Sequence, residues 1–456
     1  MRSLRTAAGL AALALAALLA AAPSAHATAA PSAHAATSVD DDNVPAPPPL
    51  RASAPAGDAP GPAPGLRAPR SCAPLPMGTA VAPDPPPGRR LRLSDAHRLA
   101  TGAGVLVAVI DTGVAPHPRL AGRLRGGGDF LTGGGPGAGL DDCDGHGTAV
   151  AGLIAAAPSP GDEVVGVAPG ATLLSVRQAG PSFSVPGPDG RERPAGDLAT
   201  LAEAVVLAVR SGADVVNVSE AVCLPPERAA AGGARLQAAL RLAVDADVVV
   251  VAAAGNAGVG GCGDEPGQVS LPGWYDEVVA VGSTGPDDAA AGFTVAGRWV
   301  DLAAPGTGAR SLAVGGGLTA DPLAGSSSSA ALVSGLAALV REHFPELTAA
   351  QVVDRIRATA RRPAGGRDDA LGAGAVDPVA ALTAEPAVLG VPDAPAGTGA
   401  LVGTAPRALP PAPPLDLAAV VGLLGAASAL AARLRGRDAD RAGVSPAARP
   451  PSAPPR

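Results

Sequence analysis

The sequence predicts an α/β domain built around a mostly parallel sheet. Short runs that are apolar throughout recur along the middle of the chain, and stretches with helical patterning separate them. Runs that are apolar on both faces are typical of parallel strands that helices cover on both sides. The runs are 105–110, 171–176, 214–218, 248–254 and 278–281. Their alternation with helices predicts an open α/β sheet.

The expected helices begin and end with local signals. A helix over 198–210 has Asp197 as its N-cap and Gly212 just past its end. Residues 348–351 have the spacing of a capping box and open a helix that ends near residue 359. The polar segment 178–196 is rich in Pro and Gly, so we expect a long loop there.

The start of the chain has the pattern of a signal peptide, over residues 1–27. Arg2 and Arg5 precede an apolar run over 10–22, and Ala25-His26-Ala27 follows as a cleavage site. A second site of this kind at 33–35 leaves the position of cleavage open. An N-terminal membrane anchor is the alternative, but the apolar run is short for one.

The rest of the chain divides by composition. In order, we expect a Pro/Ala-rich arm over 28–70, the globular domain over 71–384, a Pro-rich linker over 385–414, a transmembrane helix over 415–434 and a cytoplasmic tail over 435–456. The arm has no periodicity and is expected to be flexible or draped over the surface. The transmembrane helix is expected because 417–432 is apolar throughout and arginines follow it. An amphipathic or core helix is the alternative for that span.

Composition argues against several classes of partner, catalytic mechanism and metal site. The 456 residues carry a formal charge of -7 with no basic block in the middle, so we expect no nucleic-acid partner. The chain has no lysine, which excludes Ser-Lys catalytic dyads and Schiff-base lysines. Its four cysteines form no C-x-x-C pair, so for an exported protein we expect two disulfides and not a four-cysteine zinc site. The sequence leaves three pairings of the cysteines open. No Asp-rich loop has calcium spacing, and we expect no metal or cofactor.

Four consecutive serines, 326–329, open an apolar run over 330–340. They are expected at the start of a buried helix, where unpaired N–H groups and a partial positive charge suit a developing anion. The alternative is a Ser-rich loop that only caps a core helix.

Three further polar residues fall where strands end or a helix begins. Asp111 closes the apolar run 105–110, at the edge where open α/β sheets place their sites. His146 is framed by glycines in the motif Asp-Gly-His-Gly-Thr, at a loop-to-helix junction. Asn256 follows the run 248–254, an unusual position for an amide unless the amide has a function.

This order of Asp111, His146, Asn256 and a serine resembles the subtilisin-type serine proteases. The resemblance implies a subtilisin-like three-layer fold and a serine endopeptidase acting on protein or peptide substrates. It implies that Ser327 is the nucleophile, that His146 is general base and acid, and that Asp111 orients the imidazole. Asn256 and the Ser327 N–H would bind the oxyanion.

The choice of Ser327 depends on the family's register, in which Gly-Thr-Ser-x-Ala-Ala-Pro falls on residues 325–331. The departures from that pattern are Ser326 for Thr, Ser329 for the first Ala, and Ala331 for Pro. They leave the nucleophile in place, and the lost proline lies in the second turn of the helix. The substrate-binding backbone that the resemblance implies is at Ser219, Ala254 and Gly255.

Nearly the whole chain is similar to the mycosins, membrane-anchored subtilases of type VII (ESX) secretion systems. The similarity includes the motifs at 111–120 and 142–148, the signal peptide, the linker and the C-terminal span. It implies a single-pass membrane protein with its catalytic domain outside the cytoplasm and an arm that wraps the domain. It also implies type VII membrane components as partners, and the disulfides Cys72–Cys143 and Cys223–Cys262.

Two hypotheses of different class follow. In the first, the chain is an active peptidase of exported proteins; in the second, it mainly stabilises a secretion complex and proteolysis is dispensable. The intact set of candidates favours the first, because a pure scaffold has no need of Asn256. An α/β-hydrolase esterase is not expected, because its triad order and its Gly-x-Ser-x-Gly motif are both missing.

Overall fold

The computed structural model describes residues 44–57, 61–78, 85–134, 137–187, 189–263 and 265–385. The expected signal peptide, the linker beyond residue 385, the transmembrane helix and the tail lie outside these residues. Within them, no helix is both long and apolar enough to cross a membrane.

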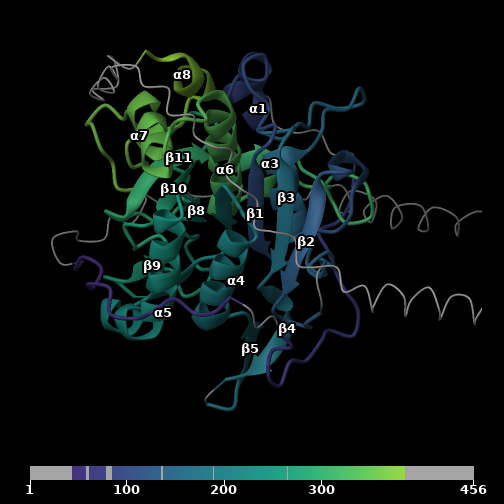
Figure 1. Ribbon diagram of the computed structural model, residues 1–456, viewed down its shortest axis with the longest axis vertical. Helices are drawn as coiled ribbons and strands as arrows, with labels where there is room; N and C mark the ends of the chain where they lie inside the picture. Colours follow the sequence, from purple (N-terminus) through teal and green to yellow (C-terminus); the bar gives the residue numbers. More distant parts are fainter. Residues whose placement is uncertain are drawn as a thin grey trace, which may run out of the picture. The chain divides into compact units, whose positions relative to one another are not determined.

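A seven-stranded parallel sheet forms the centre of the domain (Figure 1). In sheet order the strands are β11 (Val300–Pro305), β10 (Val279–Thr284), β8 (Val249–Ala253), β6 (Val215–Val218), β1 (Leu106–Asp111), β3 (Thr172–Arg177) and β2 (Leu124–Asp129). Every neighbouring pair in this sheet is parallel. The predicted α/β class is therefore confirmed, and each of the five predicted apolar runs overlaps one of these strands.

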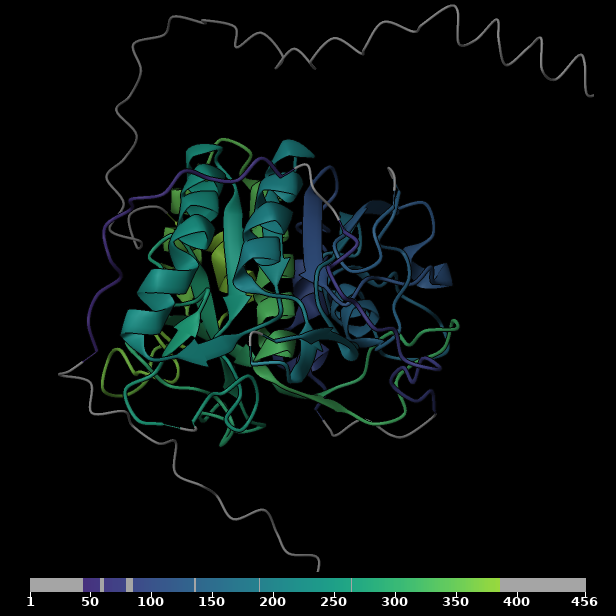
Figure 2. The same cartoon turned by 90° about the horizontal axis from the view of Figure 1, so that it is seen from below.

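Helices cover both faces of the sheet and make two cores. One core lies under α3 (His146–Ala155), α6 (Ser326–His343) and α7 (Ala349–Thr359). The other lies under α4 (Leu198–Arg210) and α5 (Pro226–Asp245), which run side by side in Figure 2. Alternate residues of β1 enter opposite cores, so the strand is apolar on both faces.

Local capping residues determine where two of the helices begin. Asp197 accepts a hydrogen bond from the Thr200 N–H at 2.8 Å, and Thr200 Oγ1 accepts one from the Asp197 N–H. Thr348 and Gln351 make the same reciprocal pair at the start of α7. Each pair satisfies N–H groups that the first helical turn leaves open. Both helix starts lie where the sequence predicts them.

The segment 178–196 is a β-hairpin in the structure, where we expected a loop. It consists of β4 (Gly180–Pro186) and β5 (Glu192–Ala195), paired antiparallel. Phe183 turns inward and packs with Leu131 and Cys143 in a small third core. The exposed positions of the two strands are prolines and polar residues, and the prolines and glycines of the segment gave the sequence its loop-like composition.

Shorter elements complete the domain. They are α1 (Pro87–Arg90), α2 (Leu93–Ala96), the 3-10 turn η2 (Pro118–Leu120), β7 (Val222–Leu224) paired with β9 (Val269–Leu271), β12 (Thr307–Ala309) paired with β13 (Leu323–Ala324), and α8 (Pro378–Thr383).

The described part of the N-terminal arm lies against the domain. The Pro45 carbonyl accepts a hydrogen bond from Trp274 Nε1 at 3.1 Å, and the Pro48 carbonyl accepts one from Gln237 Nε2 at 3.0 Å. Further along, Arg67 bridges to β4 through backbone hydrogen bonds with Ser184. The described arm is therefore held on the surface by backbone contacts along its length.

Two disulfides fasten the domain. One joins Cys72 at the end of the arm to Cys143, three residues before α3, and the other joins Cys223 in β7 to Cys262. This is the pairing that the mycosin resemblance implies. It leaves no free cysteine among the described residues.

Candidate active site

The candidate residues meet at one edge of the sheet. Asp111 is the last residue of β1, Ser219 follows β6, and Asn256 lies three residues beyond β8. Because neighbouring parallel strands end at the same edge, these three are brought together there. His146 and Ser327 come from the first turns of α3 and α6, which begin at that edge.

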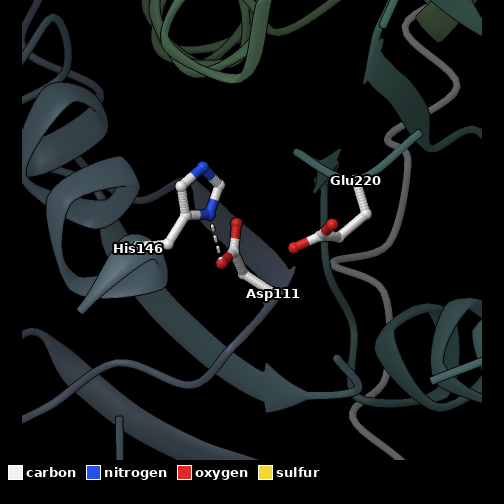
Figure 3. A group of neighbouring side chains, drawn as sticks. All are labelled: Asp111, His146 and Glu220. Carbon is white, nitrogen blue, oxygen red and sulfur yellow. Dashed lines mark hydrogen bonds and ion pairs between the residues drawn. The ribbon is translucent and has the colours of Figure 1, made fainter. Parts of the chain in front are cut away.

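Asp111 and His146 form a hydrogen-bonded pair (Figure 3). His146 Nδ1 lies 2.7 Å from Asp111 Oδ1, which also accepts the Thr112 N–H at 2.7 Å. Asp111 is fully buried, whereas the imidazole is 35% exposed. Burial alone lowers the pKa of His146, but the charge of Asp111 and the hydrogen bond to it outweigh burial and raise the pKa to about 10.

Two glycines explain how the imidazole reaches Asp111. Gly145 is the N-cap of α3 and has φ 81°, a left-handed conformation that other residues avoid. Gly147 lies so close to β1 that a Cβ there would come within 2.1 Å of the Gly113 carbonyl oxygen. The glycines on either side of His146 are therefore required by the turn and by the close packing of helix on strand.

A buried carboxylate organises the loop before α3. Asp142 Oδ1 accepts from Thr112 Oγ1 and the Gly145 N–H, and Oδ2 accepts from the N–H and hydroxyl of Thr148. Burial raises the pKa of Asp142, while these four hydrogen bonds oppose that change. Sequence reasoning did not single out Asp142, although its place in the Asp-Cys-Asp-Gly-His motif was a signal.

The four serines have different surroundings. Ser326 is fully buried, and its Oγ accepts the Gly255 N–H at 3.1 Å. Ser329 is fully buried, and its hydroxyl donates to the Ala304 carbonyl at 2.9 Å. Ser328 is 4% exposed. Ser327 alone of the four is half-buried, and it lines a pocket together with His146.

Asn256 presents its amide nitrogen toward the same space. Its Oδ1 accepts the Ser326 N–H at 2.9 Å, and a backbone N–H can bond only to the oxygen of the amide. This leaves Nδ2 as the donor on the other side. A Cβ built on Gly325 would lie 3.1 Å from Ser327 Oγ and 3.4 Å from Asn256 Nδ2, so both groups border one small space.

The pocket has a volume of about 550 Å³. Its walls include His146, Ser327 and Asn256, together with Ser219 and Gly255 of the expected substrate-binding backbone. Ala254 is not in the wall. It is fully buried, and its N–H donates to the Val281 carbonyl in β10.

A chain of buried hydrogen bonds links Ser219 to the start of α6. Ser334 donates to Asn217 Oδ1, Asn217 Nδ2 donates to Ser219 Oγ, and Ser219 Oγ lies 3.4 Å from the Ser327 carbonyl. Asn217 and Ser334 were missed in the sequence, because polar residues inside apolar runs gain meaning only when the fold pairs them.

Glu220 was also missed, although a charged residue just after a buried strand was a signal for it. It lines the pocket, and one potential ligand atom from each of Asp111, His146 and Glu220 lies within 4.8 Å of the others. A cation held there would compete with the proton shared between the imidazole and Asp111. We therefore assign no metal site to this group, and we interpret it as a cluster that shares protons.

Comparison with known proteins places this geometry in a family. The family model described as "Subtilase family" matches residues 102–374. Mycosin-1 of Mycolicibacterium smegmatis is 43% identical over 338 residues, which are 67% of this chain and 73% of that protein. Mycosin-1 of Mycobacterium tuberculosis is 45% identical over 333 residues, 66% of this chain and 73% of that one.

Solved structures agree with the sequence comparison. The MycP3 protease from the type VII (ESX-3) secretion system superposes with a TM-score of 0.65 at 41% identity, covering 75% of this chain and 100% of that one. A chain of the periplasmic assembly from the ESX-5 inner membrane complex superposes with a TM-score of 0.67 at 36% identity, covering 81% and 100%.

Proposed function

The chain belongs to the subtilase family as a serine endopeptidase of the mycosin type, and from this premise we propose that it cleaves exported proteins at the outer face of the membrane with Asp111, His146 and Ser327 as its triad. One observation carries the proposal. His146, which is hydrogen-bonded to Asp111, borders one pocket together with the half-buried Ser327 and the amide of Asn256.

In the proposed mechanism, Ser327 Oγ attacks the carbonyl carbon of a peptide bond and His146 Nε2 takes its proton. The imidazolium that forms is stabilised by Asp111 through Nδ1–H, and it returns the proton to the leaving amine. Water then repeats the sequence on the acyl-enzyme. Among the described residues no hydrogen bond yet joins Ser327 to His146, and such bonds are often long before substrate binds.

The negative charge that develops on the carbonyl oxygen in the transition state must be stabilised by hydrogen-bond donors. Asn256 Nδ2 and the Ser327 N–H are the proposed pair, because the amide is oriented by Ser326 and the Ser327 N–H lies in the open first turn of α6. Such donors contribute about 2.7–4 kcal/mol each; the figure comes from subtilisin, a member of this family.

Covalent labelling tests the assignment of the nucleophile. A fluorophosphonate probe should label the full chain with its disulfides intact, and mass spectrometry should locate the adduct on Ser327. Ser327→Ala should abolish labelling, whereas Ser326→Ala and Ser328→Ala should retain it, because adjacent residues on a helix point about 100° apart. Labelling that persists in Ser327→Ala would contradict the assignment.

We also propose that the chain is anchored by the span 415–434 and joins a type VII secretion complex. The mycosin relatives and the ESX-5 assembly support this, as does the apolar span followed by arginines. Membrane fractionation of the full chain against one that ends at residue 410 tests the anchor. Equal solubility of the two would contradict it.

A mainly structural role within such a complex is the second candidate, and it is favoured by the relatives solved as parts of the ESX-5 complex. Complementation separates the two. If Ser327→Ala restores secretion to a strain that lacks the protein, the structural role is sufficient. If only the wild type restores it, proteolysis is required.

A further inference from the structure

A second carboxylate lies beside the Asp111–His146 pair. Glu220 comes two residues after β6, at the edge where Asp111 ends β1. One oxygen of each acid and one nitrogen of His146 lie within 4.8 Å of one another. Figure 3 shows the Glu220 carboxylate directed toward Asp111. The triad mechanism gives Glu220 no part.

Asp111 has an oxygen that Glu220 could engage. Oδ1 accepts from His146 and from the Thr112 N–H, whereas the buried Oδ2 has no donor among the described residues. A protonated carboxyl group at Glu220 is such a donor. To reach Asp111 it would have to move through only part of the distance between the two carboxyl groups, which have oxygens within 4.8 Å of each other. Burial, and then the charge of Asp111, raise the pKa of Glu220 to about 7, as expected for two acids side by side.

The charges around this cluster are mostly negative. The ionisable groups facing His146 or Glu220 are Asp111 on β1, Asp142 and Asp144 in the loop before α3, and Arg193 and Arg228, which line an adjoining pocket with Glu220. The two acids of the cluster therefore act on the imidazole in the same direction, toward its protonated form.

We propose that Glu220 is a positioning residue that sets the pH at which His146 becomes available as a base. The inference rests on the proposed function, because it concerns the same proton transfer. When Glu220 is ionised, two carboxylates stabilise the imidazolium, so the resting site must lose a proton before it can accept one from Ser327. The same charge stabilises the imidazolium that forms in the transition state. While it is ionised, Glu220 therefore slows the reaction at pH values where His146 is still protonated and favours it at higher pH.

Glu220→Gln tests this, because it keeps the size and a hydrogen-bond donor for Asp111 while removing the charge. The second-order rate constant for fluorophosphonate labelling, measured against pH, reports deprotonation of His146 in the free protein. We expect the acid limb of this profile to lie at least one pH unit lower in the variant. At a pH above about 7, where Glu220 is ionised, and below both limbs, the variant should react faster than the wild type. The gain should be less than tenfold for each pH unit that separates the two limbs, because the variant has the lower rate at alkaline pH. At alkaline pH the variant should be slower than the wild type.

Two further variants separate charge from structure. Glu220→Leu removes the charge and the donor, and it should move the limb in the same direction. Asp321→Asn removes an exposed carboxylate from the same pocket wall but outside the cluster, and its limb should stay at the wild-type pH. A limb that stays in place in both Glu220 variants would overturn the proposal.

An NMR titration of His146 makes the test independent of turnover. It compares Ser327→Ala with Ser327→Ala/Glu220→Gln, and His146→Ala assigns the signal among the six histidines of the chain. A midpoint that falls on removal of Glu220 supports the proposal, even if no variant takes the probe, in which case only the proposed function fails. An unchanged midpoint overturns the proposal even if the protein is an active peptidase.

Discussion

At the scale of single residues, the fold gives different roles to chemically identical side chains. Ser326 and Ser329 use their hydroxyls to join α6 to Gly255, two residues after β8, and to Ala304 in β11. Ser327 is left facing the pocket. In the sequence the four serines could be separated only by the family register, because their partners come from segments about 25 to 71 residues away. Glu220 could not be placed beside Asp111 for the same reason.

Removing the amide of Asn256 should slow the reaction without unfolding the domain. We expect Asn256→Ala to lower the turnover of fluorescently labelled casein by about 10²–10³-fold per active site, because one oxyanion donor is lost. Asn256→Asp keeps an acceptor for the Ser326 N–H but has no donor at Nδ2, so it should be at least as slow. Near-wild-type turnover in both variants, with unchanged circular dichroism, would show that Asn256 does not bind the oxyanion.

At the scale of elements, local signals predicted structure well where the determining contacts are themselves local. The capping pairs of α4 and α7 lie within four residues, and the central strands are apolar on both faces. The strand β2 was not predicted, because its sequence, Leu-Arg-Gly-Gly-Gly-Asp, lies at the edge of the sheet and is held by pairing with β3. The hairpin β4–β5 was missed because only Phe183 and a few neighbours face a core.

The cap of α4 should have a measurable effect on stability. Asp197→Ala removes the acceptor for the Thr200 N–H, and we expect it to cost about 1 kcal/mol of the free energy of unfolding. Asp197→Asn is the matched control, since asparagine caps helices about as well as aspartate does. Thermal unfolding should give a midpoint about 2 °C lower for the alanine variant. Equal midpoints for all three proteins would mean that tertiary contacts of α4 outweigh its cap.

At the scale of the whole molecule, the arm and the active-site loop are one connected unit. The Cys72–Cys143 disulfide joins the arm to the residues just before the Asp-Gly-His motif. Beyond it, the Leu75 N–H donates to the Asp144 carbonyl, and the Ala320 N–H donates to the Pro76 carbonyl. Leu75 and Pro76 also line the pocket. The segment that directly follows the arm therefore forms part of the wall of the candidate site, which its composition could not indicate.

Loss of the Cys72–Cys143 link should destabilise the protein and release the arm. The two cysteines are 71 residues apart, and closing a loop of that length removes enough entropy from the unfolded chain to stabilise the native state by about 4 kcal/mol. The Cys223–Cys262 link, 39 residues apart, should contribute a similar amount but holds β7 and not the arm. Serine replacements of each pair can be compared by denaturant unfolding and by limited proteolysis. We expect both to lose stability, and only the Cys72/Cys143 variant to be cut rapidly within the arm. If the arm resists cleavage equally in both variants, its backbone contacts to Trp274, Gln237 and Ser184 are sufficient to hold it without the disulfide.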